Sequence, residues 1–186
     1  MKQKRPQRVE LLKDKSLLPQ VYRLRVEAWK QSKYGFLVDP ERFPTGMHDE
    51  FDATATHWIA RDGERLVGSG RVNILKGLDD LCGDEAKAFK DYIGEGHTRI
   101  GLLSRLVIHP DYRFRGLSRE FDVLRLRYLK EQGVRMVIGY ANPERLQRLN
   151  QYGFIELGPI TVSVAGKFEP YTYTVILADL HQTNLG

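Results

Sequence analysis

Residues 104 to 118 read Ser-Arg-Leu-Val-Ile-His-Pro-Asp-Tyr-Arg-Phe-Arg-Gly-Leu-Ser, and this stretch is the most informative part of the chain. An apolar run typical of a buried strand ends in a basic turn that contains Gly116. An amphipathic pattern typical of a helix begins directly after the turn. Because the first N–H groups of a helix lack an intrahelical acceptor and lie at the positive end of the helix dipole, the stretch predicts a site for an anion.

The side chains of the turn strengthen this prediction. Arg113, Arg115 and Arg119 supply positive charge, and Gly116 lets a ligand approach the backbone. A cofactor with a diphosphate fits such a turn. The patterns G-x-x-x-x-G-K-[ST] and G-x-G-x-x-G do not occur in the sequence, so ATP hydrolysis and NAD binding have no support. A surface helix start with solvated arginines is the alternative.

Arg113, Gly116 and Ser118 form the pattern R-x-x-G-x-S. It resembles the acyl-CoA loop R/Q-x-x-G-x-G/A of the GNAT superfamily of N-acyltransferases, with a departure at Ser118, where a small residue is retained. The sequence on either side agrees with the resemblance. Residues 106–110 are similar to the fourth strand of that family, and residues 142–154 are similar to its later helix and the entry to its sixth strand.

The resemblance implies how an acyl-CoA donor is held. Backbone amides of residues 106–108 would bind the pantetheine arm and the thioester oxygen, those of residues 114–118 would bind the diphosphate, and Asn142 would lie near the pantetheine. From the residues alone, Asn142 is also a candidate N-cap. The implied donor-binding residues are Leu106, Val107, Ile108, Arg113, Phe114, Arg115, Gly116, Leu117, Ser118, Arg119 and Asn142.

Composition sets the broad class of the protein. A length of 186 residues suits a single domain, expected to cover 1–186 with a flexible tail at 1–7. One cysteine, Cys82, and a polar start without an apolar signal segment are typical of a cytoplasmic protein. No apolar run approaches the roughly 20 residues that cross a bilayer, so no membrane association is expected.

The net charge of +5 favours anionic partners. CoA phosphates, an acidic carrier protein and nucleic acid all fit this charge. The basic residues are spread along the chain and match no nucleic-acid-binding module, so we expect no nucleic acid partner. The sequence does not define an oligomeric state.

The order of predicted elements indicates the α/β class. Hydrophobic periodicity, turn residues and capping residues predict a mixed, mostly antiparallel central sheet flanked by helices, as in the GNAT fold. Predicted strands cover residues 8–13, 57–61, 65–75, 99–108, 134–141, 160–165 and 171–177, and predicted helices cover 17–32, 84–92, 117–133 and 143–153. Leu117, Phe121, Leu124 and Tyr128 define the expected buried face of the third helix.

A second resemblance concerns the acceptor. Several residues fall in the order seen in acyl-homoserine-lactone synthases and N-acyl amino acid synthases, which share the GNAT core and take acyl chains from acyl carrier protein. Those enzymes have a glutamate two residues before the Ser104-Arg105 pair, whereas this chain has Leu102. The candidate acceptor-binding residues are Arg25, Trp29, Asp49, Asp52, Arg71 and Arg105.

Such charges suit an amino acid acceptor. An arginine can bind its carboxylate bidentately, and a carboxylate such as Asp52 can hold its ammonium group and accept its proton. The alternative is a structural ion-pair network. His109, beside the basic turn, is another catalytic candidate. The family's usual tyrosine, which acts as the acid toward the leaving thiolate, is replaced here by Leu149, so Tyr140 is a candidate for that role. No histidine has the spacing of a metal ligand, so no metal is expected.

These features predict an N-acyltransferase that moves an acyl group, most simply acetyl, from acyl-CoA to the amine of a small molecule or amino acid by direct attack. Two alternatives stay open. One is an N-acyl amino acid synthase that depends on acyl carrier protein, and the other is a non-catalytic module that binds acyl-CoA.

Overall fold

A computed structural model describes residues 8–32, 35, 38, 41, 43–81, 83–94, 96–162, 171–183 and 185. The predicted tail at 1–7, Cys82 and the last three residues of the strand predicted at 160–165 lie outside these residues. No helix of the described part of the chain is long and apolar enough to cross a membrane.

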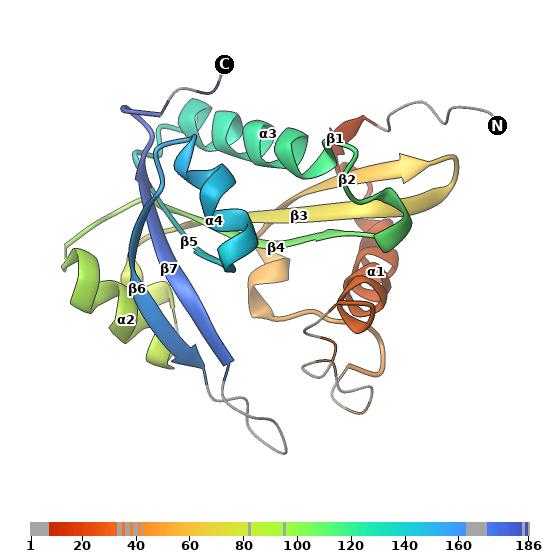
Figure 1. Ribbon diagram of the computed structural model, residues 1–186, viewed down its shortest axis with the longest axis horizontal. Coiled ribbons are helices and arrows are strands. Elements are labelled where there is room, and N and C mark those ends of the chain that lie inside the picture. The colour runs from red at the N-terminus through yellow and green to blue at the C-terminus, as the bar shows by residue number, and fades with distance from the viewer. Residues whose placement is uncertain are drawn as a thin grey trace. The chain divides into compact units, whose positions relative to one another are not determined.

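Within the described residues, seven strands form one sheet in the order β1-β2-β3-β4-β5-β7-β6 (Figure 1). Pairing is antiparallel for β1–β2, β5–β7 and β6–β7 and parallel for β4–β5. The strands are β1 (Val9–Leu11), β2 (Thr56–Asp62), β3 (Arg65–Leu75), β4 (Ile100–Ile108), β5 (Met136–Ala141), β6 (Ile155–Val162) and β7 (Tyr171–Asp179). The predicted α/β class, with a mixed sheet flanked by helices, is confirmed.

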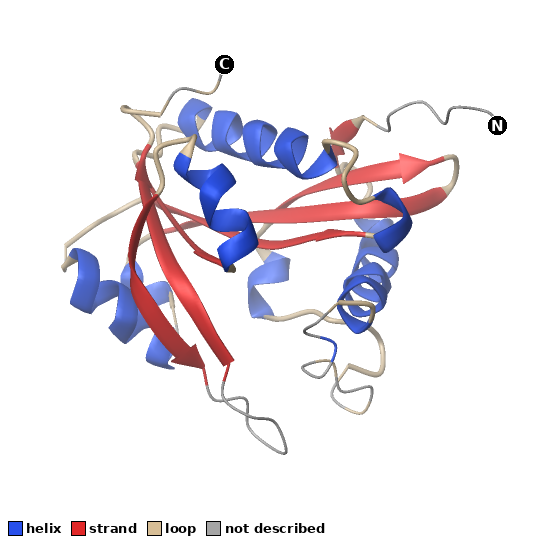
Figure 2. Cartoon of the chain, in the orientation of Figure 1, coloured by secondary structure: helices blue, strands red, loops and turns tan. Residues whose placement is uncertain are grey.

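Four α-helices and several short 3-10 helices occur in the same described residues. The α-helices are α1 (Leu18–Lys30), α2 (Gly83–Ile93), α3 (Leu117–Glu131) and α4 (Pro143–Asn150). The 3-10 helices are η1 (Lys15–Leu17), η3 (Glu50–Ala53), η4 (Leu78–Asp80) and η5 (Pro110–Tyr112). Figure 2 shows the helices and strands by class.

The chain divides into two compact units. The first comprises residues 1–71 and 105–125, and the second comprises residues 72–104 and 126–186. Strands β3 and β4 and helix α3 each contribute residues to both units. The arginine-rich turn and every candidate acceptor-binding residue belong to the first unit.

In the first unit, α1 supplies an apolar face. Pro19 lies in its first turn, where the missing N–H costs nothing, and Val21, Leu24 and Ala28 are buried. These three residues pack with Ile59 of β2 and Val107 of β4. Residues at helical spacing thus meet residues of the sheet, as the periodicity predicts.

Helix α3 packs closely on β3 at two glycines. A Cβ atom at Gly68 would lie 2.9 Å from the Phe121 ring, and one at Gly70 would lie 3.2 Å from that ring and 3.3 Å from Nε of Arg125. Real Cβ atoms almost never approach other atoms as closely as at Gly68, and the distances at Gly70 are tighter than most real Cβ contacts. The two glycines therefore let α3 lie against the strand backbone.

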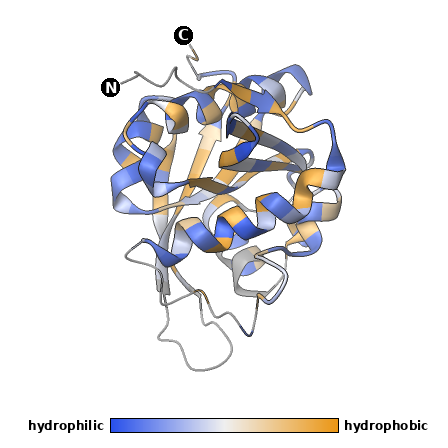
Figure 3. Ribbon diagram, turned by 90° about the vertical axis from the view of Figure 1, so that its right-hand side faces the viewer, coloured by the Kyte–Doolittle hydropathy of each residue, from blue (hydrophilic) through white to orange (hydrophobic). Residues whose placement is uncertain are grey.

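The buried face of α3 differs from the prediction. Leu117 and Phe121 are buried as expected, whereas Leu124 and Tyr128 are only half-buried. The remaining buried residues of this helix are Asp122, Arg125, Leu126 and Leu129. Apolar spacing does not include charged side chains in a core, so it predicted only part of the buried face. Figure 3 shows hydrophobic residues along the central strands and mixed residues along the helices.

In the second unit, β5 and β6 both pair with β7. A Gly158 bulge interrupts the β6 register between Glu156 and Gly158. Strand β6 begins at Ile155, five residues before the predicted start, and β5 begins at Met136, two residues after it. Asn142 caps α4, since its side chain accepts a hydrogen bond from the Arg145 N–H at 3.1 Å, which confirms the predicted N-cap.

Candidate functional site

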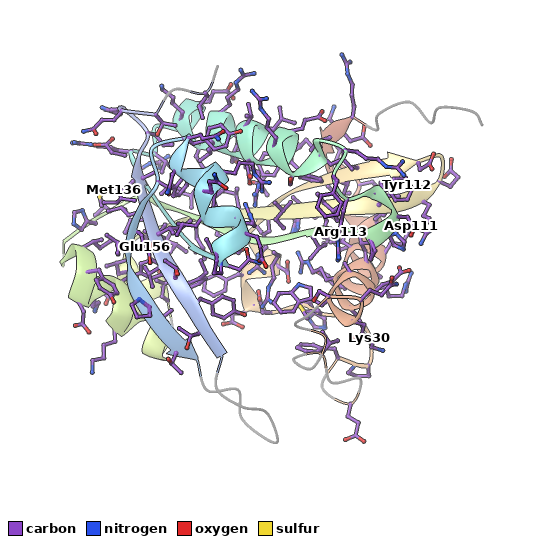
Figure 4. The ribbon with its side chains drawn as sticks, viewed as in Figure 1. Lys30, Asp111, Tyr112, Arg113, Met136 and Glu156 are labelled. Carbon is purple, nitrogen blue, oxygen red and sulfur yellow. The ribbon has the colours of Figure 1, made fainter. Side chains whose placement is uncertain are left out.

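The arginine loop, residues 113–119, begins at a fixed side chain. The guanidinium of Arg113 donates to the carbonyl of Ile108 at 3.2 Å and to the carbonyl of Ala28 at 3.0 Å. Figure 4 labels Arg113 next to Tyr112, and it labels Lys30 separately on α1. Arg113 therefore connects the end of β4 to the last turn of α1, and its charge is half-buried.

The tip of the arginine loop is exposed. Phe114 has a φ of 60° and is fully exposed, and Gly116 has a φ of 83° with no atom within 4 Å of a Cβ built there. Arg115 lies over the Tyr112 ring at 5.1 Å from its centroid. A non-glycine residue in the left-handed region costs about 1–3 kcal/mol, and such strain is concentrated at functional sites.

Helix α3 starts directly after Gly116. Leu117 is buried and anchors the helix, Ser118 is half-buried and Arg119 is exposed. A Glu120 carboxylate oxygen accepts a hydrogen bond from the Val9 N–H at 3.0 Å, which ties the first turn to β1. The start of α3 is therefore held on its inner side, while the side that carries Arg119 faces solvent.

We expect Arg113→Ala to lower the free energy of unfolding by about 1.5–3 kcal/mol, because a charged donor to two carbonyls is lost. Arg115→Ala removes only an exposed cation–π contact, worth about 0.5–1 kcal/mol. Urea unfolding of both variants measures the difference. Equal losses would show that Arg113 does not anchor the loop.

Asp52 and Arg25 form the buried half of an arginine–aspartate network, which comprises Arg25, Asp49, Asp52, Arg71 and Arg105. The two side chains make a bidentate pair with both N–O distances at 2.9 Å. Arg25 is completely buried and Asp52 is 4% exposed. Arg25 also donates to the Met47 carbonyl at 3.1 Å.

Asp49 forms the more exposed half of the network. Its carboxylate accepts from Arg71 through both guanidinium nitrogens and from Arg105 at 2.6 and 3.2 Å. Arg71 also lies 3.0 Å from an Asp52 oxygen, so it bridges both aspartates. The side chains of Arg105 and Asp49 are 32% and 19% exposed, which makes this pair the solvent edge of the network.

Local sequence fixes the two aspartates. Asp49 caps η3 by accepting from the Phe51 N–H at 3.1 Å, and Asp52 accepts from the Asp49 N–H at 3.0 Å. This reciprocal capping box holds both carboxylates toward the arginines. Arg105 reaches Asp49 from a φ of 52°, a strained position in the middle of β4.

The charges in the network lower the pKa values of both carboxyl groups. Burial alone would raise the pKa of Asp49, but hydrogen bonds and charge from Arg71 and Arg105 lower it to about 2. Burial would also raise the pKa of Asp52, but the hydrogen bonds and charge of Arg25 and the charge of Arg71 outweigh this effect and lower it. Three guanidinium groups therefore face two carboxylates, which leaves one positive charge in excess.

His57 lies beside the network and was missed by the sequence analysis. Its Nε2 is 3.4 Å from the Asp52 carbonyl oxygen, and burial together with the charge of Arg25 lowers its pKa. The ring is therefore neutral at physiological pH and does not add to the excess positive charge. A histidine in a strand carries no sequence pattern that places it next to an ion pair.

His109 and Trp29 have structural contacts. The His109 Nδ1 accepts from the Asp111 N–H at 3.3 Å, and its Nε2 lies 3.0 Å from a Glu27 oxygen, so both ring nitrogens have partners. Trp29 packs against the apolar cluster under α1. Roles as a base for His109 and as an acceptor contact for Trp29 stay predictions.

Tyr140 lies in the second unit, on β5. Its ring is 5.4 Å from the Phe89 ring and 5.8 Å from the Tyr173 ring, measured between centroids. It is half-buried in this aromatic group. Its role as an acid, and contacts of Asn142 with a pantetheine arm, stay predictions.

The acetyltransferase (GNAT) domain model matches residues 20–120, which is more than half of the chain. The chain belongs to the GNAT acetyltransferase family. The matched range contains the whole arginine loop and the whole arginine–aspartate network. The comparison with curated proteins gives no match.

Solved structures share the fold at low sequence identity. BjaI, a CoA-dependent acyl-homoserine lactone synthase solved with MTA, aligns at a TM-score of 0.67 and 18% identity over 95% of this chain and 84% of BjaI. FeeM, an N-acyl amino acid synthase from uncultured soil microbes, aligns at a TM-score of 0.63 and 14% identity over 95% of this chain and 92% of FeeM. The ribosomal-protein-S18-alanine N-acetyltransferase from Escherichia coli aligns at a TM-score of 0.57 and 12% identity over 94% of each chain.

Proposed function

We propose that this GNAT protein is an N-acyltransferase that takes the acyl group from acyl-CoA. The observation that carries the proposal is the arginine loop, in which a strand, a positive-φ glycine and a helix N-terminus come together beside exposed Arg115 and Arg119. Backbone amides and arginines of such a loop suit the diphosphate of CoA. We assign donor binding in the first unit to residues 106–108 and 113–119.

The reaction we propose is direct aminolysis of the thioester. The acceptor amine loses a proton and attacks the thioester carbon, a C–N bond forms, the C–S bond breaks and the thiolate takes up a proton. The proton acceptor is unassigned. Asp52 is a poor candidate in its present state, because both of its oxygens accept from arginines and its pKa is lowered.

We further propose that the acceptor carries a carboxylate. The network as a whole carries an excess positive charge, and its solvent edge, the pair Asp49 and Arg105, is partly exposed. An arginine binds a carboxylate bidentately, and Asp49 attracts an ammonium group. Both ends of an amino acid therefore have a charged partner at this edge.

A second candidate follows from the same network. An N-acyl amino acid synthase would use these charges for its acceptor and would receive the acyl group from acyl carrier protein. A carrier protein delivers a phosphopantetheine arm without adenosine diphosphate, so the arginine loop would then serve as a basic docking surface.

The donor comparison tests the proposed function. We expect acyl-CoA to be used with a kcat/KM at least about tenfold above that of acyl carrier protein of equal acyl length, or roughly 1.4 kcal/mol in transition-state stabilisation. Steady-state kinetics over a panel of amino acids and other amines measures it. A preference for the carrier protein that weakens with salt would favour the synthase instead. Binding of acyl-CoA without turnover of any amine would support the non-catalytic module.

A further inference from the structure

A second buried ion pair lies on α3, outside the arginine–aspartate network. Asp122 and Arg125 are 0% and 1% exposed, and an Arg125 nitrogen lies 2.6 Å from an Asp122 oxygen. Burying two charges costs several kcal/mol of desolvation per ion, so such a pair is weak evidence for a gain in stability. Its other contacts indicate what it does.

Arg125 contacts the backbone of β3. Its guanidinium donates to the carbonyl of Arg71 at 3.3 Å and to the carbonyl of Phe121 at 3.2 Å. The close approach depends on Gly70, because a Cβ there would lie 3.3 Å from Nε of Arg125. The guanidinium therefore lies against β3 at Gly70 and Arg71.

Arg71 has partners on the opposite face of the strand. Successive side chains of a strand point to opposite faces, so the side chain of Arg71 lies opposite the position where Gly70 meets Arg125. That side chain bridges Asp49 and Asp52. The carbonyl of Arg71 thus accepts a hydrogen bond from Arg125, while the side chain of Arg71 binds both aspartates.

We infer that Arg125 is a positioning residue that fixes the Arg71 backbone and thereby sets the geometry of the Asp49 edge for the acceptor. The inference rests on the proposed function for its kinetic consequence. Arg125 follows the arginine loop on α3, and its contact with the Arg71 carbonyl leads to the Asp49 edge, so we expect an effect on the acceptor and none on donor binding. Asp122 holds the Arg125 guanidinium in place.

The test compares Arg125→Met, the double variant Asp122→Leu/Arg125→Met and the control Arg127→Met, which changes an exposed arginine of the same helix. The double variant removes both buried charges and should regain the stability lost in Arg125→Met. We expect its kcat/KM for the acceptor to stay about 10- to 100-fold below wild type, since small misplacement of a binding group has effects of this size. The CoA affinity and the control should match wild type.

Gly70→Ala is a second way to disturb the contact of Arg125 with β3, and it retains both buried charges. Its methyl group would lie 3.2 Å from the Phe121 ring and 3.3 Å from Nε of Arg125, so it should displace Arg125 and reproduce the loss in acceptor kcat/KM. Recovery of both stability and acceptor kinetics in the double variant would overturn the inference and leave Arg125 with a purely structural role.

An activity-free measurement separates this inference from the proposed function. The Asp49 carboxyl contacts Arg71 and Arg105 directly and has Asp52 and Arg25 nearby. If Arg125 positions Arg71, this carboxyl should titrate at higher pH in the double variant than in wild type. Carboxyl ¹³C NMR measures this. An unchanged Asp49 titration would overturn the inference, whereas a shifted titration without any acyl transfer by wild type would contradict only the proposed function.

Discussion

Asp52→Asn is expected to lower the free energy of unfolding by about 3–5 kcal/mol, the usual cost of removing one partner of a buried pair. Arg25 is completely buried and makes both of its bidentate contacts to Asp52, so the variant leaves a buried guanidinium without its counter-charge. The Asn side chain also replaces the charged acceptor of the Asp49 N–H. Urea unfolding at neutral pH measures the change.

Glu10→Gln is the matched control for Asp52→Asn. It also converts a carboxylate to an amide, but in an exposed pair with Arg61, and such surface pairs contribute about 0–1 kcal/mol. Replacing both buried partners, as in Arg25→Met/Asp52→Leu, should restore much of the lost stability. If Asp52→Asn lowers the free energy of unfolding no more than the control does, Asp52 has no structural role and is available for catalysis.

The arginine loop could be predicted because its features are local. The apolar run, Pro110, Gly116 and the helical pattern lie within fifteen residues, and the strand, turn and helix occur where the pattern indicates. The contact of Arg113 with the Ala28 carbonyl could not be predicted, because it joins residues 85 positions apart. The sequence indicated that Arg113 is basic but not that its charge is engaged by the protein.

The network was only partly predictable. Resemblance selected its five charged residues, and the sequence left open whether they bind a substrate or one another. The structure shows the ion pairs, with Arg25 and Asp52 27 positions apart and Asp49 and Arg105 56 positions apart. Capping preferences explain how Asp49, the N-cap of η3, and Asp52 are held together, but their burial depends on the packing of α1 and the sheet.

The buried pair Asp122–Arg125 was not predicted at all. Hydrophobic periodicity assigns charged residues of a helix to the solvent face, which is correct for most helices. Here the absence of side chains at Gly68 and Gly70 makes room for Phe121 and Arg125 against β3. The glycines were visible in the sequence, but only the topology shows that α3 covers them.

Asp49→Asn is expected to lower kcat/KM for the acceptor by about 100-fold while leaving CoA affinity unchanged. The carboxylate lies at the solvent edge of the network and touches both Arg71 and Arg105, and lost charge–charge contacts at binding sites cost about 2–5 kcal/mol. Steady-state kinetics and calorimetry with CoA measure the two quantities. Glu50→Gln is the control, because it changes the adjacent, exposed carboxylate of the 3-10 helix that Asp49 caps.

The pH dependence of the Asp49→Asn variant distinguishes its charge from its shape. The folded-state pKa of Asp49, about 2, lies below the ordinary value of 3.8, so its contribution to stability is complete above the ordinary value and is lost as pH falls through the folded value. The stability difference between wild type and Asp49→Asn should therefore be constant near neutral pH and decrease as pH falls from about 4 toward 2. Unfolding curves over this range measure it. A difference that persists undiminished at the acid end would show that shape, and not the charge held by Arg71 and Arg105, is what Asp49 contributes.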